Sequence, residues 1–214
     1  MKTYDYQSKG VEIVAGDEVI ASEQRAGQHA LKTKSGREFV ADGVVAGIGI
    51  EPNVGLAKDA GLKVEDGIIV DEFLRTSAPG IYASGDVASF HNPALGKRIR
   101  VEHEDNANSM GKAAGRNMAG MMEPYDHLPF FYSDLFELGY EAVGELDSRL
   151  EIFADWKREN EEGVIYYLKE GRVRGVLLWN VWDQVPAARE LIAAPGPFSA
   201  ETLKGRLPAP KKKS

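Results

Sequence analysis

Four β-rich runs followed by one helix constrain the fold of this 214-residue chain more than any other feature. The runs are "YEAVGEL", "LEIFADWK", "GVIYYLKEG" and "VRGVLLWN", with polar turns at "NEEG" and "KEGR". Strands joined by turns this short pair antiparallel. A helix is predicted from about Gln184 to Ala194, with Pro186 in its first turn. We therefore expect an antiparallel sheet closed by a helix, with regular structure ending at the following "PGPF".

The first 50 residues predict short strands and no helix. The strand-like runs are "VEIVAG", "DEVIASEQ", "HALKTK" and "GVVAGIGI", with the turn "KSGRE" between the last two. A β-meander of this size without a covering helix is small for an independent domain. We expect it to be part of something larger that begins before Met1.

The middle of the chain predicts two helices and two strands. Residues 53–62 form a short helix, and residues 68–74 and 80–84 are strand-like. Residues 104–122 predict the best helix, with Glu104 and Asp105 at its positive end. One face of that helix carries Ala107, Met110, Gly111, Ala114, Met118, Met121 and Met122.

Composition excludes several kinds of chemistry. A formal net charge of −7 gives no general nucleic-acid footprint, and no apolar run approaches the ~18 residues of a membrane span. The sequence has no cysteine, and its four histidines show no helical zinc spacing. Any chemistry must therefore come from a bound cofactor or from carboxylates, and we expect no metal, nucleic-acid or membrane partner.

The stretch "VVAGIGIEPN" imitates a dinucleotide-binding turn. Gly47 and Gly49 follow a predicted strand, but Pro52 stands where the third glycine of G-x-G-x-x-G belongs. No other G-x-G-x-x-G occurs in the sequence. The element that normally grips an ADP pyrophosphate is missing.

The pair Gly85-Asp86, after a strand-like run, has two readings. Gly85 would let a ligand approach the backbone, and Asp86 would accept hydrogen bonds from its hydroxyls, as a polyol clamp does. Alternatively, Asp86 caps the next turn or pairs with Arg98 or Arg100. Nearby, the N-terminus of the helix at 104 could stabilise negative charge on a reduced flavin, or the helix could simply pack without a ligand.

Taken together, the motifs resemble a known family. "VVAGIGIEPNVGLAKDAGL", "VDEFLRTSAPGIYASGDVA", "RVEHEDNA", "FFYSDLFELGYEAVGEL" and "GVLLWNVWDQVPAARELI" follow one another as in pyridine-nucleotide-dependent flavoprotein reductases. The last two resemble the apoptosis-inducing factor and ferredoxin reductase-like branch. The resemblance implies an α/β fold with an α+β C-terminal domain, a partial two-nucleotide-domain reductase. The implied parts are the latter NAD-binding domain (1–54), a second FAD-binding segment (55–125), a C-terminal reductase or dimerisation domain (126–196) and a flexible tail (197–214).

The resemblance also implies a set of cofactor-binding residues. Those for FAD are Gly85 and Asp86 at the ribityl chain, Glu102, His103 and Glu104 beside the flavin and nicotinamide, and Tyr132 at the flavin ring. Those for the nicotinamide nucleotide are Gly49, Glu141 and Asn180. Glu104 replaces a histidine of the closest relatives and Tyr132 replaces a tryptophan, so ring stacking and redox tuning can differ here.

The implied activity is that of an FAD-dependent NAD(P)H oxidoreductase. Hydride passes from NAD(P)H to the flavin and electrons pass to an unknown acceptor, for which ferredoxin, rubredoxin, quinone and oxygen are all open. The flavin does the chemistry, so no catalytic side chain is required. A disulfide-reductase role is disfavoured, since His127 lacks an evident partner and cysteine is absent. We expect a cytoplasmic homodimer, or a mitochondrial one in a eukaryote.

Both G-x-G-x-x-G motifs of the family are missing. We therefore expect a C-terminal portion of a longer enzyme that is inactive alone and binds FAD weakly or not at all. The alternative is a non-catalytic dimerisation or interaction module, because residues 126–194 carry the aromatic runs "FFY", "YY" and "WNVW".

Overall fold

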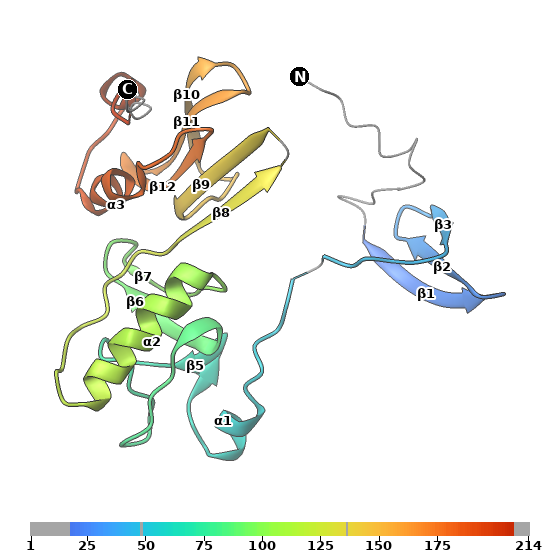
Figure 1. Ribbon diagram of the computed structural model, residues 1–214, viewed down its shortest axis with the longest axis horizontal. Helices are drawn as coiled ribbons and strands as arrows, with labels where there is room; N and C mark the ends of the chain where they lie inside the picture. Colours follow the sequence, from blue (N-terminus) through green and yellow to red (C-terminus); the bar gives the residue numbers. More distant parts are fainter. Residues whose placement is uncertain (1–17, 48, 136, 208–214) are drawn as a thin grey trace. The chain divides into compact units, whose positions relative to one another are not determined.

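The computed structural model describes residues 18–47, 49–135 and 137–207 (Figure 1). The chain divides into two compact units, Met1–Ile50 and Glu51–Ser214, and each is described by itself. No helix in the described part of the chain is long and apolar enough to cross a membrane.

The first unit is a three-stranded antiparallel meander. Its strands, in the order β1-β2-β3, are β1 (Val19–Arg25), β2 (Gln28–Thr33) and β3 (Glu38–Ala41). The expected turn at "KSGRE" is confirmed, but the strand expected at residues 43–50 is wrong. That segment has no strand pairing in the described residues, and its Val45 is fully exposed. The run "VEIVAG" lies outside the described residues.

The second unit begins with the short helix α1 (Gly55–Asp59) and a four-stranded sheet. The sheet has the order β4-β5-β6-β7, with β5 and β6 parallel and the other pairs antiparallel. Its strands are β4 (Val64–Glu65), β5 (Gly67–Ile69), β6 (Ala88–Asn92) and β7 (Lys97–Arg100). The hairpin of β6 and β7 was not predicted.

The two strand-like runs of this segment are shorter than expected. The strand expected at 68–74 ends at Ile69, because the Asp71 carboxylate accepts hydrogen bonds from the backbone N–H groups of Phe73 and Arg75 and folds the chain into a turn. The run 80–84 forms only one bridge, between Arg75 and Tyr82.

The long helix α2 (Glu104–Met118) buries a different face from the one expected. Met110 and Ala114 are buried as predicted, in a cluster with Val70, Leu74 and Phe90. The prediction is wrong for the last residues of that face, because the helix ends at Met118, and Met118, Met121 and Met122 are 66%, 55% and 44% exposed. The helix ends because the buried Asn117 side chain bonds the backbone N–H and C=O of Glu123 and turns the chain back.

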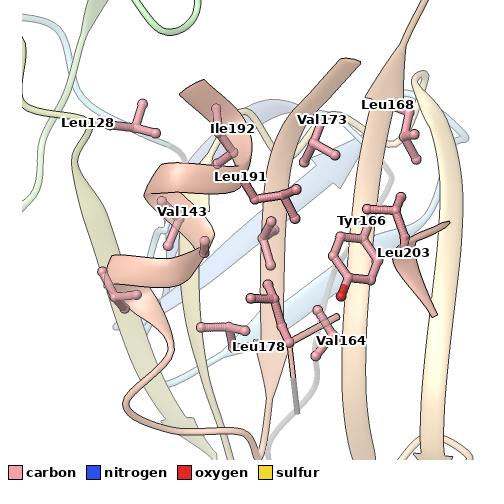
Figure 2. Packing of buried hydrophobic residues seen from close by; sticks show 14 of the residues in the cluster. Leu128, Val143, Val164, Tyr166, Leu168, Val173, Leu178, Leu191, Ile192 and Leu203 are labelled. Atoms are coloured by element: carbon pink, nitrogen blue, oxygen red, sulfur yellow. The ribbon is translucent and has the colours of Figure 1, made fainter. Parts of the chain in front are cut away.

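The C-terminal part is the expected antiparallel sheet closed by a helix. Five strands pair in the order β10-β11-β12-β9-β8, and α3 (Val185–Ala193) packs on β9 and β12 (Figures 1 and 2). Figure 2 shows Leu191 and Ile192 of α3 beside Val143 and Leu178 of the sheet, all buried in one cluster. The strands are β8 (Phe130–Leu135), β9 (Leu138–Gly144), β10 (Glu151–Arg158), β11 (Glu162–Lys169) and β12 (Arg172–Trp179).

Regular structure continues beyond "PGPF", against expectation. The short helix α4 (Ala200–Leu203) follows it, and Leu203 and Leu207 are buried in the same core as Tyr166. These two leucines cover apolar surface of the sheet that would otherwise be exposed to water. Residues up to 207 therefore pack as part of the domain.

Candidate functional site

The Gly85-Asp86 pair forms a 3-10 turn, η2 (Gly85–Val87), which packs on α2. Gly85 has φ +76°, a conformation that glycine adopts without strain. Its backbone N–H donates to Met110 Sδ at 3.2 Å, and a Cβ at Gly85 would lie 3.9 Å from Ala107 Cβ. The turn is therefore held in place by the helix.

The Asp86 carboxylate is exposed and makes no hydrogen bond or ion pair with any described residue. Neither pairing considered for it from the sequence occurs. Arg98 donates to the backbone carbonyls of Val70 and Ser89, and Arg100 donates to the Asp86 backbone carbonyl at 3.2 Å. The carboxylate remains available to a ligand.

The N-terminus of α2 is uncapped. His103 is its N-cap residue, in extended conformation, and no side chain of a described residue bonds the free N–H groups of the first turn. Glu104 accepts only a long bond from Asn108, at 3.4 Å. The helix therefore presents unpaired amides and a partial positive charge.

His103 connects this helix end to the C-terminal sheet. Its ring stacks on Phe131 with centroids 4.4 Å apart and an interplanar angle of 23°. Burial lowers the pKa of His103, opposed by the Glu102 backbone and by the carboxylates of Asp86, Glu102 and Asp105. The neutral imidazole is therefore favoured, and the stacking places β8 next to the helix end.

Tyr132 and Glu141 are direct cross-strand partners in β8 and β9. Tyr132 is 62% exposed, whereas Glu141 Oε2 is buried without a hydrogen-bond partner. Burial, and then the nearby Asp183 carboxylate, raises the pKa of Glu141. An exposed ring beside an unsatisfied acceptor is typical of a ligand site rather than of a finished core.

Asn180 and Gly49 stand apart from this group. The Asn180 side chain accepts from the Gly139 N–H and donates to the Glu161 carbonyl, both at 2.8 Å, so its amide already ties loops of the sheet together. Gly49 has φ +84° and belongs to the first unit. The structure thus groups Gly85, Asp86, Glu102, His103 and Glu104 at one helix end, and Tyr132 with Glu141 on β8 and β9.

An open cleft of about 330 Å³ adjoins the helix end. Charged and apolar side chains both line it, including Glu102, His103, Arg100, Ile99 and Glu145. Burial acts to raise the pKa of Glu145, but hydrogen bonds from Lys97 and Arg174 outweigh it and leave that pKa lowered. This ion-paired carboxylate fixes β7 to β12 across the cleft.

Two polar networks were missed from the sequence. Arg100 binds Asp66, Glu102 and the Asp86 backbone. His127, expected to lack a partner, lies 2.6 Å from Asp105 Oδ2, which also accepts from Arg189 at 3.0 Å. That expectation is wrong because these partners are 22 and 84 residues from Asp105, a separation that no local pattern reports.

Comparison with known proteins decides the family. Residues 3–111 match the family described as pyridine nucleotide-disulphide oxidoreductase. This chain belongs to that family. Residues 114–162 and 153–194 match the family described as apoptosis-inducing factor, mitochondrion-associated, C-term, so the resemblance in the sequence is confirmed.

Several members of the oxidoreductase family are similar over most of this chain. Apoptosis-inducing factor 1, mitochondrial, of Dictyostelium discoideum is 33% identical over 207 residues, which cover 89% of this chain and 39% of that protein. The covalent putidaredoxin reductase-putidaredoxin complex has a TM-score of 0.75 at 31% identity, covering 88% of this chain and 46% of that chain. An FAD-dependent pyridine nucleotide-disulphide oxidoreductase from Desulfovibrio vulgaris has a TM-score of 0.70 at 26% identity, covering 83% and 48%. The chain thus spans less than half the length of these relatives, and the partial reductase fold is confirmed.

The residues present fit one part of a dinucleotide flavin. The unpartnered Asp86 carboxylate and the free amides of α2 suit the ribityl chain and the ring, and Glu141 Oε2 offers an acceptor nearby on β9. The absence of G-x-G-x-x-G from the sequence leaves the ADP part without its usual cradle.

Proposed function

We propose that this chain supplies flavin-facing and nicotinamide-facing residues of an FAD-dependent NAD(P)H oxidoreductase. One observation carries the proposal: the free Asp86 carboxylate sits on a turn fastened to α2, whose N-terminus is also free. The carboxylate can accept hydrogen bonds from hydroxyl groups, and the helix N-terminus carries a partial positive charge. A polyol chain joined to an electron-accepting ring requires both groups side by side.

Each residue has a distinct role in this proposal. Gly85 and Asp86 bind the ribityl hydroxyls, and the α2 amides with Glu102, His103 and Glu104 border the ring. Tyr132 packs on the ring and Glu141 accepts a hydrogen bond from the nicotinamide carboxamide. When bound, the flavin would accept hydride from NAD(P)H and pass electrons on. The side chains named here would orient the flavin and exclude water.

The wider setting is part of the same proposal. Residues 55–125 serve as the FAD segment and 126–196 as the C-terminal domain, with 1–54 belonging to the NAD-binding part. The named putidaredoxin complex supports a small redox protein such as a ferredoxin as acceptor, with rubredoxin, quinone and oxygen as the other candidates. We expect a homodimer in the cytoplasm, or in mitochondria as the name of the Dictyostelium relative suggests.

The interaction-module alternative has less support. Within the runs "FFY", "YY" and "WNVW", only Tyr132 and Trp182 are exposed among the described residues. Two separate rings make a small docking surface. Sedimentation with and without NADH and FAD distinguishes the two functions, because a pure module dimerises regardless of ligand.

Flavin binding by the 214-residue protein tests the proposal directly. In titrations followed by quenching of flavin fluorescence, we expect riboflavin, FMN and FAD to bind weakly and with similar dissociation constants. Only the ribityl and ring parts of these flavins have partners in the described residues. Asp86→Ala should weaken all three by about 10-fold or more, the value of one charged hydrogen bond. Asp59→Ala is the matched control, because Asp59 is an exposed carboxylate on α1 and should leave binding unchanged.

Two results would contradict it. Absence of binding by every flavin would remove the proposed role of this helix end. Stoichiometric FAD binding with a strong preference over riboflavin would show that the chain binds the ADP half of FAD without a G-x-G-x-x-G motif.

A further inference from the structure

The geometry points to Arg100 as the residue that positions the flavin-facing groups, by fixing the Asp86 turn and Glu102 relative to one another. This inference rests on the proposed function and deepens it. Arg100 itself is not assigned a contact with the cofactor, so it acts as a positioning residue.

One guanidinium reaches three segments of the chain. Arg100 Nε donates to Asp66 Oδ1 at 2.8 Å, which anchors the side chain on the turn between β4 and β5. Its Nη1 donates to the Asp86 backbone carbonyl at 3.2 Å and to Glu102 Oε1 at 2.5 Å. Arg100 Nη1 therefore joins the backbone of Asp86, the proposed ribityl ligand, to Glu102, which precedes the N-cap residue of α2.

The Arg100 side chain is mostly buried beside Gly67, and it also lines the open cleft described above. Arg100 is 11% exposed, and it lies against Gly67, which has φ +92°. A Cβ at Gly67 would come within 2.7 Å of Arg100 Cδ and 2.5 Å of the Val87 carbonyl oxygen. A side chain at Gly67 would meet the Val87 carbonyl first and the Arg100 stem second, so glycine at this position also leaves Arg100 its place. The Asp66 partner is 74% exposed, whereas the Arg100 side chain is 11% exposed.

The planar guanidinium suits this task in a way that an ammonium does not. Its donors have fixed directions, so Nε and Nη1 can hold two partners at a set angle, whereas lysine offers a point charge on a flexible stem. Displacements of about 1 Å in binding groups can cost about 100-fold in function. Losing Arg100 should therefore loosen η2 and Glu102 independently.

Three variants of the full chain test this role. Arg100→Gln removes the charge and the fork, and Arg100→Lys keeps the charge alone. Arg98→Gln is the matched control, since Arg98 lies on the same strand and donates only to the Val70 and Ser89 carbonyls. The readouts are amide hydrogen exchange over residues 84–87 and 101–106, the FMN dissociation constant, and the absorbance shift of bound FMN.

We expect Arg100→Gln to raise exchange in both segments and the FMN dissociation constant by about 10-fold or more. Arg100→Lys should leave hydrogen exchange, the FMN affinity and the absorbance shift impaired, whereas a role that needs only the positive charge would be rescued fully by lysine. Arg98→Gln should keep wild-type FMN affinity within about twofold.

The outcomes separate this inference from the proposed function. Wild-type FMN affinity and exchange in Arg100→Gln would overturn the inference and leave the function standing. Full rescue of affinity by Arg100→Lys, or equal loss in Arg98→Gln, would also overturn it. Failure of the wild-type chain to bind FMN would overturn the function, and the positioning role with it.

Discussion

Two regions of the second unit use their polar groups differently. In the C-terminal sheet, Asn180 and Glu145 are bonded within the chain around a core of aliphatic side chains. At η2 and the N-terminus of α2, Asp86 and the first-turn amides have no partner in the described chain. The two regions therefore differ in exposure: the helix end keeps exposed hydrogen-bonding groups for a ligand, whereas the sheet bonds most of its polar groups internally and the atoms that lack a partner there, such as Glu141 Oε2, are buried.

The largest effect should come from the core of the sheet. Leu178 is fully buried, so Leu178→Ala should lower the free energy of unfolding by about 3 kcal/mol. Urea denaturation measures the loss. Ile152→Ala, on the same sheet but 47% exposed, should lower the free energy of unfolding by less than about 1 kcal/mol. Equal losses in the two variants would contradict the view that the buried aliphatic core stabilises this sheet.

An intermediate effect is expected at Asp105, which links the two regions. Asp105→Ala removes the acceptor of the Phe130 N–H and of Arg189 Nη2, whereas Arg189 Nε keeps its bond to the Leu128 carbonyl. Because these side chains are partly exposed, we expect a loss of about 1–2 kcal/mol rather than the larger cost of a fully buried pair. Thermal unfolding measures it, with Glu104→Ala as a control within about 0.5 kcal/mol.

A small effect on stability is expected at Asp86 itself. Its carboxylate is exposed and unpaired, so Asp86→Ala should change the free energy of unfolding by less than about 0.5 kcal/mol while weakening flavin binding. Denaturation and titration of one sample check both. A marked loss of stability would mean that Asp86 belongs with the structural polar groups.

The smallest effect is the pH dependence contributed by Glu141. Its pKa is raised in the folded chain, so protonation favours folding. The contribution is complete below the ordinary pKa of 4.5 and disappears as pH rises through the raised folded value. Urea unfolding should show the free energy of unfolding falling as pH rises through this window, and Glu141→Gln should lack that fall. The same fall in the variant would assign it to another titrating group.

The sequence predicted those elements whose signal is local. The runs of β9 to β12 alternate or fill a core, and Pro186 marks the start of α3, so their types were found. The hairpin of β6 and β7 was missed because the interior strand "ASFHN" buries polar residues such as Ser89 and Asn92, and the edge strand "KRIR" is short and basic. The buried face of α2 was misplaced because Asn117, a polar residue, ends it.

The candidate site was proposed through linked motifs. The sequence suggested Gly85-Asp86 and the helix at 104 as ligand-binding elements, the family resemblance added Tyr132 and Glu141, and their role in binding stays a prediction. Arg100 and His127 gave no signal, because their roles depend on partners brought together by the fold. Asn180 shows the reverse case, since a residue of suggestive type already has its amide bonded to the backbone.

The contacts of Asp105 have a consequence for motion. A single carboxylate oxygen accepts from the Phe130 N–H and from Arg189 and lies against His127, so one atom of α2 holds both the connecting segment and α3. Any movement of the C-terminal sheet away from α2 would have to break the hydrogen bonds that the Phe130 N–H and Arg189 donate to this oxygen. The position of the first turn of α2 is thereby tied to the position of the C-terminal sheet.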